Sequence, residues 1–200
     1  MKYFFILLFM TSLNCFGQDY KAQIAAYRKG YTEDFLKDKS SPLKETDLQF
    51  LRFYDADSTY RVEAKVVIIS NAPTFVMPSF NGSGQQYIGY AVLKFMLKGK
   101  PMQLMAYSSI ALSKLPEYSN YLFIPFTDDT NGAVTYTGGR YIDLSKADLK
   151  GDSIVIDFNK AYNPYCAFGG GYSCPKPPEE NQLRVPIEAG EKLFAGANKH

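Results

Sequence analysis

The residues with the clearest chemical potential lie together in the C-terminal part of the chain, in the run Ile154–Glu191. A strand-like segment there gives way to a long irregular stretch, which holds two cysteines and five prolines among Asn, Asp, Glu and Tyr side chains. Long irregular segments inside a compact domain are usually either functional or disordered, and the many anchoring residues argue against disorder. We therefore expect the functional site in or beside this stretch.

Polar side chains beside the last predicted strand have the types that line a binding cavity. In an extended strand Asp157 and Asn159 point to the same side, and a Tyr-Asn pair follows them. Arg140 comes after two glycines, where an arginine can reach into a pocket and hold a carboxylate or phosphate through two hydrogen bonds. We therefore predict a binding module for a small polar or anionic ligand. The expected ligand-binding residues are Arg140, Tyr141, Asp157, Asn159, Tyr162, Asn163 and Asn181.

Other roles fit the same residues. Asp and Asn side chains before turns also bond to nearby backbone groups, so these residues could simply anchor the segment, with Arg140 paired to Asp157 or Glu191. Alternatively, Asp157 with Glu180 or Glu191 would be the acid–base pair of a carboxylate-based hydrolase, as in glycoside hydrolysis. A structural or partner-binding protein of the cell envelope would instead present an exposed aromatic patch.

The chemistry that the sequence lacks narrows the function classes. Its single histidine is the final residue, His200, which we discount because chain ends are rarely ordered. Without a usable histidine, Ser-His and Cys-His catalysis and most zinc and iron sites are excluded. A Walker-type GxxxxGK(S/T) motif is also missing. We predict no cofactor and no metal, and we leave open whether the protein is an enzyme.

Cys166 and Cys174 are expected to form a disulfide, because two cysteines that bracket a glycine-rich stretch in an exported chain are typical of one. Closing so short a loop would contribute roughly 2.5 kcal/mol in the chain-entropy model. A redox pair or half of a metal site are the alternatives. Redox pairs usually lie two residues apart, and two thiolates alone would leave a zinc ion short of ligands.

The N-terminal segment is typical of an export signal. Lys2 supplies the positive charge, Tyr3–Leu13 is an apolar run, and cleavage is expected after Gly17. The run is too short to span a bilayer, which takes about 20 residues. A lipoprotein acylated at Cys15 is the alternative, although Ser12 and Asn14 fit such a site poorly. We therefore expect a secreted or periplasmic protein without a stable membrane span.

The composition limits the possible partners and the number of domains of the mature chain. Removing residues 1–17 takes away only Lys2 among the charged side chains, which leaves 21 basic and 20 acidic residues. Such a balance gives no electrostatic reason to bind nucleic acid or an anionic membrane surface. Residues 18–200 are long enough for a single domain with its own core. Its oligomeric state stays open.

The hydrophobic periodicity predicts one helix followed by strands. Apolar residues recur every three or four positions over Asp19–Lys37, which predicts a helix, and a capping pattern predicts a helical turn over Thr46–Phe53. From Tyr60 the period becomes two. The expected strands are Tyr60–Ile68, Thr74–Ser79, Gln85–Leu97, Met102–Ser108, Tyr121–Phe126, Arg140–Leu144 and Ser153–Phe158. We therefore predict a mostly β protein, an antiparallel barrel or sandwich with the N-terminal helix packed against it and a long C-terminal loop region.

Two blocks of motifs carry a family resemblance. The first comprises Phe126-Thr127-Asp128, Thr135-Tyr136 and Gly139-Arg140-Tyr141. The second comprises Asp157-Phe158-Asn159, Ala161-Tyr162-Asn163-Pro164, Cys166, Cys174-Pro175, Pro177-Pro178, Glu180-Asn181, Leu183 and Ala189-Gly190-Glu191. Together they resemble the bacterial family DUF1684 over most of the mature chain. The glycine-rich stretch Ala167–Tyr172 departs from the bulkier residues of that family, and the resemblance implies no activity.

Overall fold

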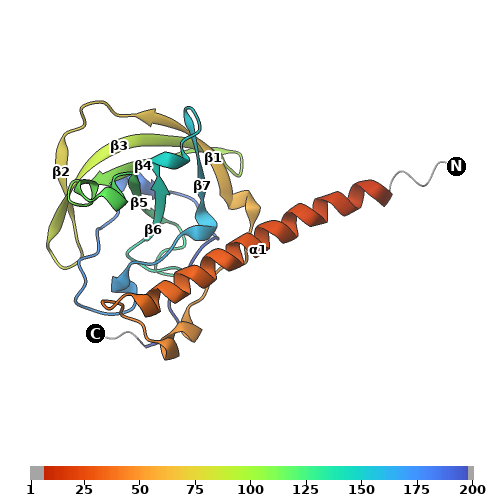
Figure 1. Ribbon diagram of the computed structural model, residues 1–200, viewed down its shortest axis with the longest axis horizontal. Helices are drawn as coiled ribbons and strands as arrows, with labels where there is room; N and C mark the ends of the chain where they lie inside the picture. Colours follow the sequence, from red (N-terminus) through yellow and green to blue (C-terminus); the bar gives the residue numbers. More distant parts are fainter. Residues whose placement is uncertain (1–6, 198–200) are drawn as a thin grey trace.

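Alternation of apolar and polar residues produces a mostly antiparallel sheet behind one long N-terminal helix (Figure 1). The computed structural model describes residues 7–197. Its regular elements are α1 (Leu7–Lys37), β1 (Arg61–Ile68), β2 (Thr74–Pro78), β3 (Gly84–Leu97), β4 (Lys100–Ser109), β5 (Tyr121–Asp128), β6 (Arg140–Ser145), β7 (Ser153–Asp157) and β8 (Gln182–Leu183). The predicted fold class, mostly β with an N-terminal helix, is confirmed.

The strands form one curled sheet, a half-barrel, in the order β6-β5-β4-β3-β1-β7. Strand β2 pairs with β3, and the short β8 runs parallel to the end of β5. Because the sheet curls, its two end strands, β6 and β7, line the same cleft without pairing with each other. A cleft of about 400 Å³ there is lined by Ile142 and Leu144 of β6 and by Ile154 and Val155 of β7.

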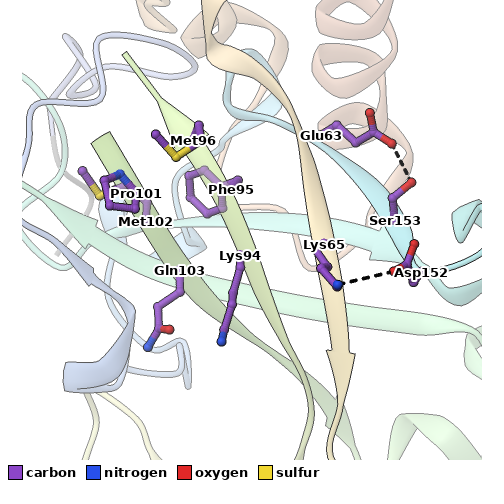
Figure 2. Close-up of a pocket in the computed structure, with 10 residues that line it drawn as sticks. All are labelled: Glu63, Lys65, Lys94, Phe95, Met96, Pro101, Met102, Gln103, Asp152 and Ser153. Atoms are coloured by element: carbon purple, nitrogen blue, oxygen red, sulfur yellow. Dashed lines mark hydrogen bonds and ion pairs between the residues drawn. The ribbon is translucent and has the colours of Figure 1, made fainter. Parts of the chain in front are cut away.

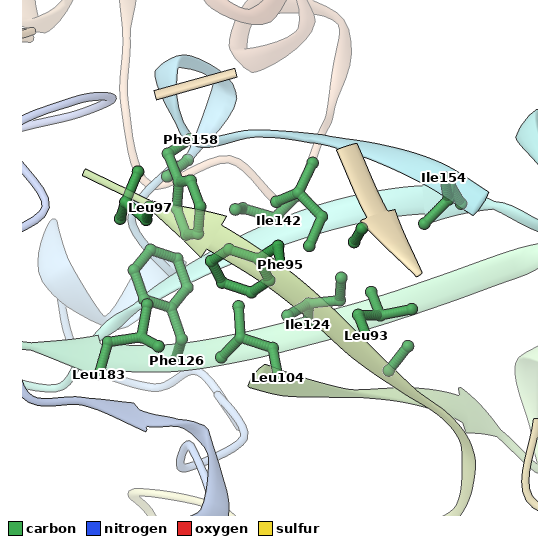
Figure 3. Packing of buried hydrophobic residues seen from close by; sticks show 14 of the residues in the cluster. Leu93, Phe95, Leu97, Leu104, Ile124, Phe126, Ile142, Ile154, Phe158 and Leu183 are labelled. Carbon is green, nitrogen blue, oxygen red and sulfur yellow. The ribbon is translucent and has the colours of Figure 1, made fainter. Parts of the chain in front are cut away.

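The core fills the inside of the curl (Figure 3). Along β3, Leu93, Phe95 and Leu97 are buried, whereas Lys94 and Met96 between them are exposed. Leu104, Ile124, Phe126, Ile142, Ile154, Phe158 and Leu183 complete the packing that Figure 3 labels. Each such side chain contributes about 1.5–3 kcal/mol when fully buried, so the period-two pattern read from the sequence is also the pattern that stabilises the fold.

Helix α1 crosses the molecule beside β6 and β7, and its N-terminal part extends beyond the sheet (Figure 1). It begins at Leu7 rather than at Asp19, so it includes part of the predicted signal segment. Residues 1–6 of that segment lie outside the described residues. Between residues 7 and 197, no helix is both long and apolar enough to cross a membrane. Phe35 of α1 packs with Leu43, Phe168 and Phe194, which joins the helix to the C-terminal segment.

The long segment after β7 is irregular, and a buried arginine holds its last part in place. Arg140 at the start of β6 has no exposed surface and pairs with the equally buried Asp128 of β5, with 2.8 Å between Nη2 and Oδ2. Its guanidinium also donates hydrogen bonds to the backbone oxygens of Ile187, Ala189 and Glu191. One side chain therefore fixes three carbonyl groups of the irregular stretch 187–191.

Two glycines allow this arrangement because each lies at positive φ against another backbone segment. Gly139 has φ +87°, and a Cβ there would lie 2.6 Å from the Phe126 carbonyl oxygen. Gly190 has φ +78°, and a Cβ there would lie 2.6 Å from the Ala161 carbonyl oxygen. Only glycine fits such positions without strain. Gly139, directly before β6, therefore allows two backbone segments to pack closely.

Replacing Arg140 is expected to be the most destabilising change in this region. In Arg140→Met, Asp128 stays buried without its cation and three carbonyl groups lose a donor, so the free energy of unfolding should fall by about 3–5 kcal/mol. Urea unfolding measures this loss. The control is Lys65→Met, which removes the exposed 3.8 Å pair between Lys65 and Asp152 and should change stability by less than about 1 kcal/mol. Equal small losses in both variants would contradict the role given to Arg140.

Candidate functional site

The structure uses several of the predicted ligand-binding residues as internal anchors. Arg140 is occupied as described, and its acidic partner is Asp128 instead of Asp157 or the Glu191 carboxylate. Asn159 is 1% exposed and bonds through its side-chain amide to both the N–H and the carbonyl oxygen of Asp57. These contacts are those of the anchoring alternative that the sequence left open.

Asn181 acts in the same way. It has no exposed surface, its Oδ1 accepts from the Met105 N–H, and its Nδ2 donates to the carbonyl oxygens of Met105 and Pro125. The amide thereby bridges β4 and β5 and fixes the start of β8. A buried side chain with all of these bonds has no remaining group aimed at a ligand.

The three carboxylates considered for acid–base chemistry lie in separate surroundings. Asp157 accepts from Tyr20 of α1 and from Asn159. Glu180 is exposed and accepts from the Tyr107 hydroxyl of β4. Glu191 is completely buried among other residues. None of these contacts brings two of the three carboxylates together.

The remaining predicted residues, Tyr141, Tyr162 and Asn163, do reach the surface of a hollow. Two adjoining hollows of about 500 and 290 Å³ share the side chains of Tyr162 and Tyr165. We call the larger one the tyrosine cleft; its polar and aromatic lining consists of Tyr27, Tyr31, Asp34, Phe35, Asp143, Tyr162 and Tyr165. Tyr121, Tyr141, Asn163 and Tyr172 are among the residues that line the smaller one.

Three segments of the chain build the tyrosine cleft. Helical spacing places Tyr27 and Tyr31 one turn apart on α1. Strand alternation places Asp143 on the side of β6 opposite the buried Ile142. Tyr162 is fixed by a backbone bridge to Tyr141, with both N···O distances close to 3 Å. The cleft is therefore held by regular structure on two sides and by a paired loop on the third.

The expected disulfide closes the loop beside the cleft. Cys166 and Cys174 are bonded, with Cα atoms 6.2 Å apart. Tyr165, next to Cys166, packs its ring against Tyr172 at 5.3 Å and donates to Asp38 at 2.7 Å. The disulfide thus holds together the loop that places Tyr165 and Tyr172 at the smaller hollow.

Asp143 is the central charged group of the cleft. Its Oδ1 accepts from the hydroxyls of Tyr121 and Tyr162, at 2.7 and 2.9 Å, and its Oδ2 accepts from Tyr162 at 3.0 Å. The carboxyl keeps exposed surface at the edge of the cleft, yet the surrounding protein reduces its hydration. This desolvation raises the pKa of Asp143, and the two tyrosine hydrogen bonds offset only part of the effect.

Glu191 lies directly behind the cleft. Its Oε2 accepts from the Tyr31 hydroxyl and from the Asn163 N–H, both at 2.8 Å. Burial raises the pKa of the Glu191 carboxyl from 4.5 to about 7, against the opposing effect of those hydrogen bonds and of Arg140. Glu191 Oε1 and Asn163 Oδ1 are both buried without a described partner.

A larger hollow, of about 730 Å³, lies over β1, β3 and β4 (Figure 2). Exposed side chains make up most of its lining, and its polar contacts join near neighbours, Lys65 with Asp152 and Ser153 with Glu63. Volume alone therefore does not identify the site. The tyrosine cleft is the better candidate because several half-buried tyrosines and a partly desolvated carboxylate line it together.

The sequence did not single out Asp143, Tyr27 or Tyr31 as site residues. A signal for Asp143 was present, because Tyr141 and Asp143 share one face of a strand whose other face carries the apolar Ile142 and Leu144. Tyr27 and Tyr31 were recognised only as part of the apolar face of a helix. The hydroxyl group of a tyrosine also gives such a face a hydrogen-bonding position, which an apolar pattern does not reveal.

The protein is a half-barrel of antiparallel strands. One helix crosses it, and an anchored loop covers it. The model of the family described as "Protein of unknown function (DUF1684)" matches residues 46–192, and the chain belongs to that family. The solution NMR structure of the uncharacterized protein from gene locus rrnAC0354 of Haloarcula marismortui is similar, with a TM-score of 0.68 and 34% identity over 88% of this chain and 95% of that one. No curated protein matches this chain.

Glu191 makes a pH-dependent contribution to stability. Because its pKa is raised in the fold, this contribution is complete below the ordinary value of 4.5 and is lost as the pH rises towards about 7. The loss is on the order of 3 kcal/mol. Glu191→Gln keeps an acceptor for Tyr31 and stays neutral, so relative to wild type it should gain stability between pH 4.5 and 8.

Urea unfolding at pH 4.5, 6 and 8 measures this difference. Glu188→Gln, at an exposed position three residues away, is the control and should follow the wild type at every pH. A constant difference between wild type and Glu191→Gln across the range would contradict the raised pKa.

Proposed function

We propose that this protein is an exported module that binds a small polar molecule in the tyrosine cleft. The observation that carries this proposal is the Asp143 carboxylate, held by the hydroxyls of Tyr121 and Tyr162 at the edge of a hollow of about 500 Å³. Binding sites for small molecules are typically hollows of roughly 300–1,000 Å³ with aromatic walls and a few placed polar groups.

The hydrogen bonds that orient the tyrosines of the cleft also favour binding. Tyr31 bonds to Glu191, Tyr162 to Asp143 and Tyr165 to Asp38, so each of these rings is oriented before a ligand arrives. Side chains that are already ordered lose little conformational entropy on binding. The rigid tyrosines therefore favour a site over a mere surface depression.

Binding is tested by saturation-transfer NMR with a library of small amines, sugars, amino acids and carboxylates. We expect at least one compound to bind. Tyr27→Ala should weaken its affinity by about fivefold, since one aromatic contact contributes about 1 kcal/mol. The control is Phe80→Ala, which removes a similarly exposed aromatic residue outside the cleft; Tyr27 is 36% exposed and Phe80 39%. Absence of any binder, or equal effects of both variants, would overturn the proposal.

Export is the second part of the proposal. A disulfide such as Cys166–Cys174 is typical of proteins in oxidising compartments, and residues 1–17 have the pattern of a cleaved signal. Intact mass spectrometry of the protein from its own cells should give a chain that begins at Gln18 and gains two hydrogen atoms on reduction. A mass that retains residues 1–17, or free thiols before reduction, would contradict export with cleavage.

A further inference from the structure

The charges that border the tyrosine cleft are acidic. Its lining contains Asp34 and Asp143 but no lysine or arginine, and the adjoining smaller hollow has no charged lining residue. Asp34 is exposed and pairs with Lys37 at 2.9 Å. Within residues 7–197, Asp143 forms no ion pair. Among the described residues, the charge of Asp143 therefore has no counterion in direct contact.

The hydrogen bonds of Asp143 leave room for a ligand. All of its described donors are neutral tyrosine hydroxyls, which orient the carboxylate without cancelling its charge. Oδ1 accepts from two of them, whereas Oδ2 accepts only from Tyr162, which it shares with Oδ1. Because a carboxylate offers about four lone-pair sites, Oδ2 retains acceptor capacity.

Aromatic rings meet at several angles in the two adjoining hollows beside this carboxylate. The centroids of Tyr31 and Tyr162 are 6.0 Å apart with planes at 48°, and those of Tyr141 and Tyr162 are 5.8 Å apart with planes at 88°. Ring faces attract cations, and sets of angled rings recognise organic ammonium ions. The Lys160 ammonium lies 5.2 Å from the centroid of the Tyr27 ring, so one ring of the cleft already attracts a cation.

From this combination we propose that the ligand of the tyrosine cleft is a small organic ammonium ion, with Asp143 as its counterion and the tyrosine rings as its walls. This inference rests on the proposed binding function and specifies the class of ligand. An anion would meet an uncompensated carboxylate, and Arg140, which would have to neutralise it, is completely buried. Asp143 also lines the cleft between β6 and β7, whose lining includes the basic residues Arg61, Lys150 and Lys160 as well as acidic ones. Because these basic residues would repel a cation, we expect the ammonium ion on the tyrosine side of Asp143.

The test compares choline with 3,3-dimethyl-1-butanol, a neutral molecule of the same shape, by calorimetric titration of the full mature chain at pH 7.5 and low salt. We expect choline to bind at least tenfold more tightly than the neutral compound. Asp143→Asn, which keeps the shape but removes the charge, should weaken choline binding at least tenfold and leave the neutral compound unaffected. Asp152→Asn makes the same charge change away from the cleft and should bind choline as the wild type does.

Further probes separate the possible failures. Ethanolamine distinguishes a primary from a quaternary ammonium ion, and tighter binding of either one than of the neutral compound supports the inference. Affinity for the neutral compound that equals or exceeds the affinity for both choline and ethanolamine, or binding of glucose or acetate but of no ammonium ion, would overturn the inference and leave the binding function standing. Failure of all these probes and of the wider library would overturn both. The comparison of choline with its neutral counterpart uses the wild type, so it decides the question even if Asp143→Asn does not fold.

Discussion

The buried ion pair between Arg140 and Asp128 is the constraint on which the rest of this structure depends. A guanidinium without exposed surface needs acceptors for its N–H groups, because an unpaired buried charge is strongly unfavourable. The carbonyl oxygens of Ile187, Ala189 and Glu191 supply acceptors for its two terminal nitrogens, Nη1 and Nη2, and this fixes the course of the C-terminal segment. Once that backbone is fixed, the Glu191 side chain lies where Tyr31 of α1 and the Asn163 N–H can both reach it. One arginine thereby determines where the helix, the loop and the C-terminal segment meet.

Tyrosine hydroxyls are the recurring partners of carboxylates in this protein. The pairs are Tyr20 with Asp157, Tyr31 with Glu191, Tyr107 with Glu180, Tyr121 and Tyr162 with Asp143, and Tyr165 with Asp38. A neutral donor orients a carboxylate but leaves its charge in place. Where the carboxylate is completely buried, as at Glu191, the result is a pKa raised to about 7. Where it keeps exposed surface at a hollow, as at Asp143, desolvation also raises the pKa, but the carboxyl stays accessible to a ligand.

Most of the fold could be predicted from the sequence because strands such as β1 and β3 alternate between buried and more exposed residues. Strand β3 was predicted over Gln85–Leu97 and spans Gly84–Leu97, since its alternation is long and regular. Strand β8 could not be predicted, because two residues carry no period, and only the parallel contact with β5 defines it. The start of α1 was placed too late, because the apolar residues before Asp19 indicate a signal segment and a helix equally well.

The residues of the candidate site were harder to predict than the strands, because irregular segments need polar side chains for their own backbone. Backbone N–H and C=O groups outside helices and sheets still need partners when they are buried. A long loop packed against a barrel therefore requires Asn, Asp and Arg side chains merely to satisfy its own backbone, as Asn159, Asn181 and Arg140 do. The same residue types mark ligand sites, so a polar cluster inside such a loop is ambiguous. Asp143 lies instead on the outer face of a regular strand, where no backbone group requires it, and an acceptor placed there is free to serve a ligand.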